Sequence, residues 1–413
     1  MAGGLWIALV AGGLIAGLGV VGALALPVGR EPVGGIASFL GFLMSLWALG
    51  RLASVYDNPQ TPVVALCLAA AALAGGYGLA SVMLPQVARQ EIPRPIPAPP
   101  SHRTALLLLS EAEPEPYDPA ATALELVELQ EDDVLNLGIV TTPFLFTAQK
   151  ARYRAVGGLS PARRQIREIA EAHERSLEGL GFEHFGVAWC SGRGSLLEQI
   201  EDLARAGYSR IVVQPLAVGE PLEMQRAKML VDRGRPDEAG VAIAYAAPLH
   251  SADAIAALLA RRIVLGVDDP TTTGVALLAH GQPETREQLH PGFDADEASF
   301  VNRIKMLVAE TGVPNQNIRL AWAEWRDPDV TSTVRHLAAL GCTRILVCPA
   351  CYAVDCIATL IDIPMAIRQA RIDPLVSVVT LSTWRDESEV VAVLRDRTLD
   401  ALRELDAPVA AGI

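Results

Sequence analysis

The sequence predicts an α/β protein with two similar lobes, each built on a parallel sheet, preceded by three transmembrane helices. Residues 1 to about 85 contain almost no charge, whereas the remainder has the composition of a soluble acidic protein. From Thr104 onward, short apolar runs alternate with amphipathic helical patterns, which is typical of parallel βαβ units. A spacing of Trp, Gly and Pro residues occurs twice in this part.

Three apolar stretches form the N-terminal part, at residues 5–26, 33–49 and 61–84. Each is about as long as a bilayer-spanning helix, which needs about 20 residues. The first could instead be a signal peptide, but it lacks a basic n-region and two further spans follow it. No ionisable residue lies in the middle of a span, so residues 1–85 are expected to be an anchor without an ion pathway. Small residues such as Gly12 and Gly13 allow close contact within the anchor or with a partner subunit.

Arginines predict the orientation of this anchor. Arg30, Arg89, Arg94 and Arg103 fall on one side of three spans, and Arg51 falls on the other. The positive-inside rule then places the C-terminal part in the cytoplasm of a multi-pass protein of the cell inner membrane. Residues 86–103 contain Pro93, Pro95, Pro97, Pro99 and Pro100, and this density predicts a stiff linker that holds the soluble part off the membrane.

Charge and cysteine usage exclude several classes of protein. The net charge of −13 argues against a nucleic-acid surface. The stretch Gly192-Arg193-Gly194-Ser195 is too short for a phosphate loop and lacks its Lys, so no nucleotide site is expected. Six cysteines are present, and in a cytoplasmic domain disulfides are their less common use.

The soluble part is expected to contain strands at residues 105–109, 185–189, 210–214, 241–246, 275–279, 319–322, 344–348 and 375–381. Helices are expected between them at residues 195–206, 222–233, 252–262, 297–311, 329–340 and 387–404. Such alternation indicates a doubly wound fold.

An internal repeat divides this part into two lobes. Ala188-Trp189, Gly207, Arg210-Ile211 and Pro215 reappear with nearly constant offset as Ala321-Trp322, Gly341, Arg344-Ile345 and Pro349. In a second match, residues 106–114 correspond to residues 275–283. We therefore expect lobes at residues 104–250 and 251–413, the latter with the C-terminal helix, and a cleft between them.

His280 is the residue around which the candidate site is predicted. Five apolar residues run directly into His280, and Gly281 and Pro283 end the strand. Open α/β sheets bind ligands at the carboxyl ends of their strands. By spacing alone, a structural histidine is the better explanation, because one motif match is only a hypothesis.

Three segments together resemble ferrochelatases, from about Thr104 to the C-terminus. These are the segment with Tyr153, Gly157-Gly158 and Ser160-Pro161, the strand end His280-Gly281-Gln282-Pro283, and the helix start Asp355–Asp362. Their order and spacing match the pattern of that family.

This resemblance implies a class II chelatase with two Rossmann-like lobes, which inserts ferrous iron into a porphyrin without ATP. It implies that His280 acts as base and metal-binding residue and that Asp362 is a secondary acid. It also implies porphyrin contacts for Tyr153, Gly157, Gly158, Ser160, Pro161, Gly281 and Pro283. Iron and porphyrin would be substrates, and no tightly bound cofactor is expected. Binding of haem is kept as an alternative.

The chain departs from the family pattern at several positions. The family glutamate opposite the histidine falls on Ala358, which can neither bind iron nor accept a proton. The neighbouring family histidine falls on Cys356. Near the first strand the chain has Glu111 and Glu113, which either line the cleft or lie on a solvated loop.

The cysteines after the seventh expected strand are candidate metal ligands. Cys351 and Cys356 are expected at the cleft, where thiolates could bind a soft metal or a haem iron. A helix N-terminus would raise the thiolate fraction. The alternative is a four-cysteine metal cluster that also uses Cys342 and Cys348. Free cysteines are often buried as small apolar residues, which argues against such a cluster.

Aromatic and basic side chains are weaker candidates. Trp189, Trp322 and Trp325 could stack on a macrocycle or pack between layers. Four arginines near the Gly-Gly segment could pair with a porphyrin's propionates or could form a solvated helix face: Arg152, Arg154, Arg163 and Arg164.

Three functions follow as hypotheses. The first is a membrane-anchored ferrochelatase-like enzyme of haem biosynthesis. The second is a porphyrin-, haem- or metal-binding subunit or chaperone of a membrane complex, which the loss of the glutamate at Ala358 favours. The third is a chelatase for another tetrapyrrole. The expected partners are porphyrin or haem, membrane lipids and membrane-protein subunits.

Overall fold

A computed structural model describes residues 2–27, 29–56, 58, 60–88 and 91–406. Two compact units form: residues 1–90 with 116–159, and residues 91–115 with 160–413. Arg89, one of the arginines used for the predicted orientation, lies outside the described residues.

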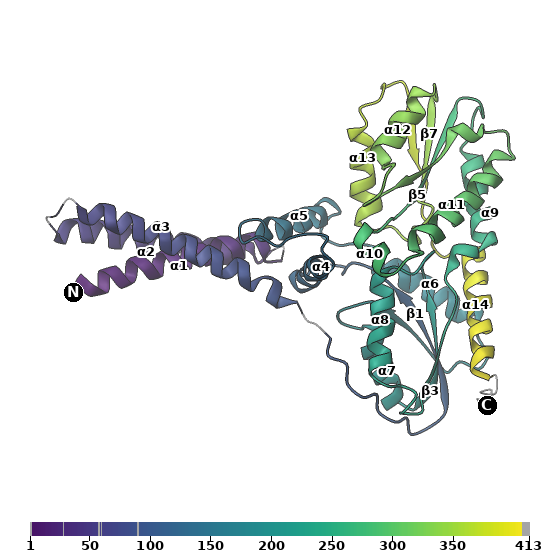
Figure 1. The fold of residues 1–413 in the computed structure, drawn as a ribbon, viewed down its shortest axis with the longest axis horizontal. Coiled ribbons are helices and arrows are strands. Elements are labelled where there is room, and N and C mark those ends of the chain that lie inside the picture. The colour runs from purple at the N-terminus through teal and green to yellow at the C-terminus, as the bar shows by residue number, and fades with distance from the viewer. Residues whose placement is uncertain (1, 28, 57, 59, 89–90, 407–413) are drawn as a thin grey trace. The chain divides into compact units, whose positions relative to one another are not determined.

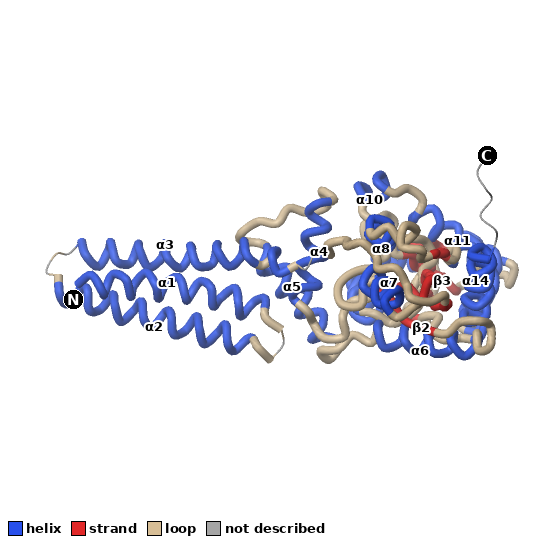
Figure 2. Tube along the Cα trace, turned by 90° about the horizontal axis from the view of Figure 1, so that it is seen from below, coloured by secondary structure: helices blue, strands red, loops and turns tan. Residues whose placement is uncertain are grey.

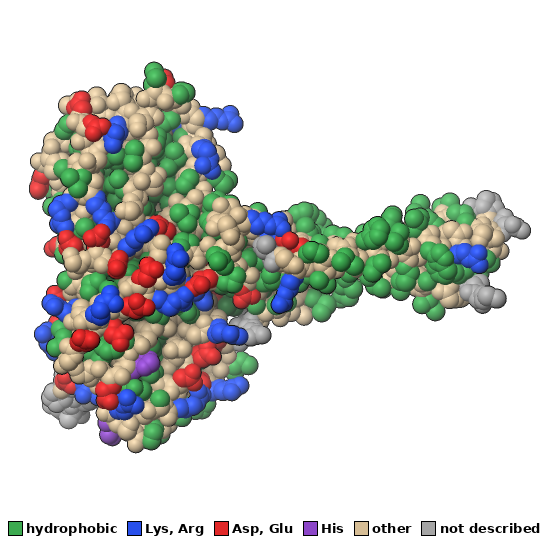
Figure 3. All heavy atoms as spheres, turned by 180° about the vertical axis from the view of Figure 1, so that it is seen from behind, with side chains coloured by type: hydrophobic (Ala, Val, Ile, Leu, Met, Phe, Trp, Pro, Cys, Tyr) green, Lys and Arg blue, Asp and Glu red, His purple; other side chains and the backbone are tan. Residues whose placement is uncertain are grey.

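The first unit contains three long helices, α1 (Ala2–Ala25), α2 (Glu31–Val55) and α3 (Gln60–Met83). They lie side by side (Figure 2) and are long and apolar enough to cross a membrane. Their exposed surface is almost entirely hydrophobic in Figure 3. Glycines set their close approach, since a Cβ on Gly12 would lie 2.6 Å from the Gly41 carbonyl oxygen. Three predicted helices are thereby confirmed.

Residues 116–159 belong to this unit and not to the first lobe, where the sequence analysis placed them. The segment contains α4 (Pro119–Glu131) and α5 (Thr142–Ala155), and the short η1 (Pro85–Val87) precedes the linker. The Tyr117 hydroxyl donates to the Ala25 carbonyl at 3.2 Å. Ala25 also packs against Phe146, so the segment completes the apolar end of the helices.

The second unit contains both lobes, which Figure 1 shows one above the other. Lobe 1 has the parallel strand order β2-β1-β3-β4, with β1 (Arg103–Ser110), β2 (His184–Trp189), β3 (Tyr208–Pro215) and β4 (Ala242–Tyr245). In Figure 1, α7 (Leu196–Arg205) and α8 (Leu222–Arg233) cover one face, while α6 (Ala162–Ser176) covers the other.

Lobe 2 repeats this topology in the order β6-β5-β7-β8. Its strands are β5 (Thr273–Ala279), β6 (Ile318–Trp322), β7 (Arg344–Cys348) and β8 (Ser377–Thr380). Its helices are α9 (Asp253–Leu265), α10 (Glu284–Leu289), α11 (Phe293–Ala309), α12 (Val330–Ala339) and α13 (Ile363–Gln369); the one-turn segments are η2 (Leu249–Ser251), η3 (Asn315–Asn317) and the π-turn η4 (Ala358–Asp362).

The central strand β5 is buried on both faces, as its apolar run predicts. Val275 and Leu277 contact the apolar cluster that includes α9 and α11. Ala276 and Leu278 point to the opposite face and join the cluster with α12 and α13. Because successive side chains alternate between the faces of a strand, a continuous apolar run is what this position needs.

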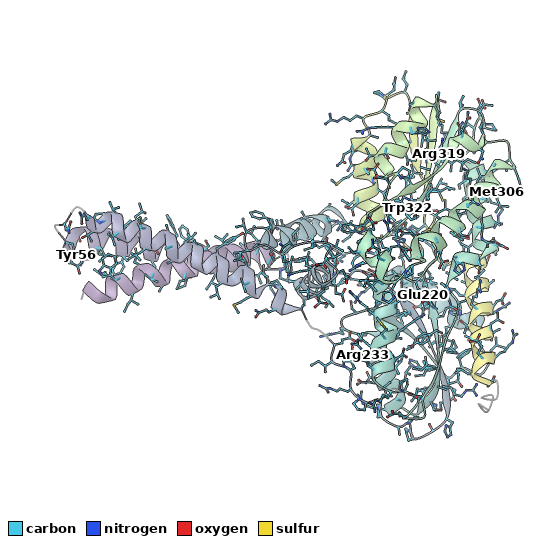
Figure 4. All side chains as sticks on the ribbon, in the orientation of Figure 1. Tyr56, Glu220, Arg233, Met306, Arg319 and Trp322 are labelled. Atoms are coloured by element: carbon cyan, nitrogen blue, oxygen red, sulfur yellow. The ribbon has the colours of Figure 1, made fainter. Side chains whose placement is uncertain are left out.

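The predicted internal repeat is confirmed in detail. Trp189 and Trp322, which end β2 and β6, each form an isolated parallel bridge, to Ser195 and to Asp329. Those two partners cap the following helices, with Ser195 accepting from Glu198 N at 3.2 Å and Asp329 from Ser332 N at 2.6 Å. Figure 4 labels Trp322 at its strand end.

The C-terminal helix α14 (Ser388–Asp406) packs against α6, β3 and β4 of lobe 1, although it follows lobe 2 in the chain. Leu106 and Ala401 share an apolar cluster there. Thr398 contacts buried His173 at 3.2 Å and donates to Gln214 at 3.3 Å. The helix therefore joins the two lobes.

The Pro-rich linker is also attached to lobe 1. Residues 91–99 form no helix or strand. Ile96 is buried and its N–H donates to the Gly234 carbonyl at 2.8 Å. Glu91 accepts from the Ser195 hydroxyl at 2.8 Å. The described part of the linker is thus docked along the lobe and is not a free spacer.

Burial of His173 makes the stability of the second unit depend on pH. Burial lowers the pKa of His173 to about 4. Below the ordinary histidine value of about 6.5, the unfolded chain binds a proton that the folded chain does not. The stabilisation is therefore fully present above about pH 6.5 and is lost as the pH falls towards about 4, a change on the order of 3 kcal/mol.

We expect the melting temperature of the purified full chain to fall more steeply between pH 6.5 and 5 than that of His173→Gln, as measured by intrinsic fluorescence in detergent. Equal slopes for the two proteins would show that His173 is not a buried neutral group.

Candidate active site

His280 lies at the carboxyl end of β5, directly beside the end of β6. Its carbonyl accepts from Glu324 N at 3.0 Å, which extends the pairing of the two strands by one residue. Gly281 follows with a φ of 77°, and a Cβ there would lie 2.5 Å from the Glu324 carbonyl oxygen. Only glycine fits this close approach, so Gly281 sets the direction in which the chain leaves the strand.

Glu297, in the first turns of α11, is the acidic partner of His280. Its side chain is only 1% exposed, whereas that of His280 is 41% exposed. One carboxylate oxygen accepts from His280 N at 2.9 Å and from Gly281 N at 3.1 Å. The other lies 2.9 Å from His280 Nδ1. The buried charge is therefore compensated by converging donors, as a buried carboxylate requires.

This arrangement fixes the tautomer of His280. An ionised carboxylate can only accept hydrogen bonds, so Nδ1 carries the proton that points at Glu297. In the neutral imidazole, Nε2 then keeps its lone pair on the exposed side of the ring. His280 can accept a proton or bind a metal ion there, and Glu297 stabilises the imidazolium that results.

Tyr352 holds the other face of the His280 imidazole. The two ring centroids are 3.8 Å apart with an interplanar angle of 39°. Burial raises the pKa of Tyr352 well above its ordinary value, and the nearby Cys356, Glu324 and Glu297 add to this, so the phenol is neutral. Within the described residues its hydroxyl has no hydrogen-bond partner. Tyr352 therefore acts on the histidine through packing.

Trp325 is presented beside the same strand end by a strained turn. Its φ is 60°, and Arg326 N donates to the Glu324 carbonyl across it at 2.7 Å, which is the rare γ-turn form. Arg326 is held by Asp294 at 2.6 Å. Trp325 is 51% exposed, whereas Trp189 and Trp322 are buried. Packing between layers accounts for the two buried indoles but not for Trp325.

Glu113 forms a polar link between the lobes. The Ser160 hydroxyl donates to Glu113 at 2.5 Å, and the Ile357 N–H of lobe 2 donates to the same oxygen at 2.9 Å. A solvated loop, one of the two expectations for this residue, is therefore wrong. Glu111 is exposed.

A second link joins α6 to the loop before the π-turn. Asp355 N donates to the buried Gln165 side chain at 2.8 Å, and Gln165 Nε2 donates back to the Asp355 carboxylate at 3.2 Å. Arg385 also pairs with Asp355. The polypeptide around Cys356 and Ala358 is thus held from both lobes.

The cysteine thiols are neutral in the absence of a metal ion, and metal binding by Cys351 and Cys356 stays a prediction. Burial raises the pKa of Cys356 to about 12, and the Glu113 charge adds to this. The helix N-terminus was expected to lower this pKa, so the shift is opposite to the prediction. Burial also raises the pKa of Cys351, whose thiol forms a hydrogen bond with Glu297. Cys342 and Cys348 are buried as well. Within the described part of the chain, no group of three His, Cys, Asp or Glu residues could hold a metal ion.

The remaining predicted residues are divided between the two units. Ser160 and Pro161 precede α6 in the second unit, and Pro283 precedes α10. Asp362 is half-buried and ends the π-turn, a helical form that is frequent at functional sites.

Tyr153, Gly157 and Gly158 belong to the first unit, and there they close α5. Tyr153 is buried edge-on against Tyr117, with centroids 5.7 Å apart. Gly157 and Gly158 adopt positive φ angles of 81° and 91°, and Gly158 N donates to the Tyr153 carbonyl. A structural reason therefore exists for all three, and their porphyrin contacts stay a prediction.

The four arginines also have protein partners. Arg154 pairs with Glu31, and Arg164 lies 3.8 Å from Glu168. Arg163 stacks on Trp189 at 4.5 Å. Arg152 donates to Gln149 at 2.7 Å. Pairing with propionates stays a prediction for them.

Sequence reasoning missed Glu297 and Tyr352. Glu297 lies on a different element from His280, and nothing in the local spacing links the two. A buried acid on the inner face of an amphipathic helix was the available signal, because carboxylates are almost never fully buried unless they are paired.

Comparison with known proteins adds independent information. The family model described as Ferrochelatase matches residues 133–402, which include His280, Glu297 and Ala358. Ferrochelatases of Citrifermentans bemidjiense and of Geobacter sp. strain M21 are each 25% identical over 290 residues, or 64% of this chain and 87% of the relative. The solved structure of SirB from Bacillus subtilis with Fe3+ covers 74% of this chain and 97% of its own, with a TM-score of 0.47 and 11% identity.

The raised thiol pKa values predict low cysteine reactivity. In the folded protein at pH 8, we expect Cys351 and Cys356 to resist iodoacetamide, because the thiolate is the nucleophile and is almost absent. Both should react after denaturation, which serves as the control. Peptide mass spectrometry measures this, and rapid labelling of Cys356 in the folded state would contradict the neutral thiol.

Proposed function

Because the chain belongs to the ferrochelatase family, we propose that it is a membrane-anchored chelatase that inserts ferrous iron into a porphyrin. The observation that carries the proposal is the pairing of His280 Nδ1 with buried Glu297, which assigns the lone pair of the neutral ring to Nε2 in a side chain that is 41% exposed. A neutral imidazole is suited near pH 7 both to accept a proton and to contact a metal ion.

Metal insertion requires that the porphyrin lose both pyrrole N–H protons as the metal–nitrogen bonds form. His280 Nε2 takes one proton, and the resulting imidazolium is stabilised by the Glu297 carboxylate on Nδ1. Its exposed side then returns the proton to water, and the cycle repeats for the second proton. Because Ala358 provides no carboxylate on the opposite wall, His280 is the base in both steps.

The half-exposed Trp325 supports binding of a flat ligand. Aromatic faces stack on macrocycles, and a strained turn that presents an indole next to a candidate base is frequent at functional sites. Trp325 would form one wall for the porphyrin, and Asp362 would serve as the secondary acid.

The three apolar helices would anchor the enzyme in the cell inner membrane, with the lobes in the cytoplasm. Their length and composition suit a bilayer, and Arg30, Arg94 and Arg103 follow spans on one side. Tethering at the membrane suits a sparingly soluble porphyrin and its metalated product.

A second function is a subunit that binds porphyrin or haem without turnover. The absence of the family acid at Ala358 is the observation that favours it. The intact pair of His280 and Glu297 would then serve to bind a metal centre.

Steady-state metalation separates the two functions. The purified full chain is supplied with ferrous iron and proto- or coproporphyrin under anaerobic conditions, and loss of porphyrin fluorescence is followed. We expect turnover by the wild type and a loss of about 10²-fold or more in His280→Ala, since a positioned base contributes roughly that factor or more. No metalation by wild type above background would overturn the enzyme and leave the binding subunit.

Glu297→Gln tests the pairing itself. The amide cannot stabilise an imidazolium as a carboxylate does, so we expect kcat to fall by about 10- to 100-fold while porphyrin affinity changes little. Glu284→Gln is the matched control, because Glu284 is exposed on neighbouring α10. Unchanged kcat in Glu297→Gln would contradict the role given to this carboxylate.

A further inference from the structure

We propose that the loop before α5 and the first half of α5, residues 137–146, are inserted into one leaflet of the membrane as a re-entrant element beside α1 and α3. The inference rests on the proposed anchoring of the three long helices. The occupant of the exposed apolar surface of this element is the acyl region of the lipids.

Composition first sets this segment apart. Between Asp133 and Lys150 the sequence contains no Asp, Glu, Lys or Arg. Ile139, Val140 and Phe144 are each more than half exposed. Contiguous exposed apolar side chains on a protein surface mark a contact with a partner or a membrane.

Contacts within the first unit show how far residues 137–146 lie from the end of α3. The Tyr77 hydroxyl of α3 donates to the Val140 carbonyl at 3.0 Å. A Cβ on neighbouring Gly78 would lie 3.7 Å from Ile139. Tyr77 comes six residues before the end of α3 at Met83, which is about 9 Å along a helix.

The first helix gives a matching depth. Gly17 packs against the backbone of α3 at Tyr77, where a Cβ would lie 2.5 Å from Tyr77 N. From Gly17 to the end of α1 at Ala25, the helical rise is about 12 Å. Val140 is therefore level with the interior of two spans and well short of their ends.

Lys150 marks the other end of the inserted half-helix. Its ammonium is buried and donates to the carbonyls of Ala23 and Leu26, at 3.0 and 3.3 Å, and lies 3.3 Å from Glu31. These acceptors lie where α1 ends and α2 begins. From Thr142 to Lys150, α5 rises by about 12 Å along its own axis.

Three carbonyls of the turn are satisfied within the protein. A bilayer core supplies no hydrogen bonds, so exposed carbonyls must be satisfied within the protein. Gly138 O accepts from the Thr142 hydroxyl at 2.9 Å and from Thr142 N. Val140 O is satisfied by Tyr77, and Thr141 O accepts from Phe144 N at 3.0 Å.

Figure 4 shows Tyr56 at the end of the three helices that is opposite α4 and α5. The segment thus gathers at one end only, the end at which Lys150 binds. In the proposed topology, that end of the helices lies in the cytoplasmic leaflet.

Spin-label accessibility in lipid nanodiscs tests the inference. Single probes are placed at Val140→Cys and Phe144→Cys in a full-length Cys67→Ser background, whose remaining native thiols are buried or half-buried. We expect high collision rates with oxygen and low rates with a water-soluble nickel chelate. Phe42→Cys on α2 is the control within a span, and Glu178→Cys on lobe 1 is the control in water.

The controls separate this inference from the proposed anchoring. If Phe42→Cys collides with the nickel chelate as Glu178→Cys does, the anchoring itself fails. If Phe42→Cys is protected while both probes in the segment collide with nickel, only the re-entrant element is overturned. Probes shielded from oxygen and nickel alike would show a protein partner on this surface and would also overturn the lipid contact.

The Tyr77 hydroxyl can be tested in the same way. Tyr77→Phe should raise nickel access at Val140→Cys, because the Val140 carbonyl then needs water as a donor. Tyr56→Phe is the matched control at the other end of the helices. An unchanged rate in Tyr77→Phe would overturn the part given to this hydroxyl.

Discussion

The buried carboxylate of Glu297 is the interaction on which the candidate site depends. A charge that is almost fully removed from water is stable only if donors converge on it, and here the backbone of His280 and Gly281, the His280 ring and the Cys351 thiol all do so. The same bonds fix the exit of the chain from β5, the orientation of the imidazole and the proton on Nδ1. Removing this one carboxylate would leave several buried donors unpaired at once.

The pair of His280 and Glu297 bears on the absence of the family acid at Ala358. His280 retains an acidic partner, but that partner is Glu297 of α11, which contacts Nδ1 of the ring. The segment around Cys356 and Ala358 is held in place by Glu113 and Gln165 of lobe 1. Without a carboxylate at Ala358, metal insertion would rely on His280 as the single base, and turnover distinguishes this from a purely binding role.

Local patterns in the sequence sufficed to predict the lobes. Buried parallel strands such as β5 are recognisable as apolar runs in the sequence. The repeated spacing of Trp, Gly and Pro predicted that β2–α7–β3 and β6–α12–β7 are equivalent units. His280 was predicted because strand ends are local features. Glu297 and Tyr352 were missed because they reach His280 through tertiary packing, which leaves no spacing in the chain. For the same reason residues 116–159 were assigned to lobe 1: the acceptors of Lys150 lie more than a hundred residues earlier.

The central claim concerns one proton, and 15N NMR of histidine-labelled protein observes it most directly. With the His280 signals assigned by their loss in His280→Gln, the account predicts a neutral ring at pH 8 that is protonated on Nδ1 and unprotonated on Nε2. In Glu297→Gln this preference should weaken. A ring protonated on Nε2 in the wild type would contradict the account, because Nε2 would then have no lone pair for a proton or a metal ion.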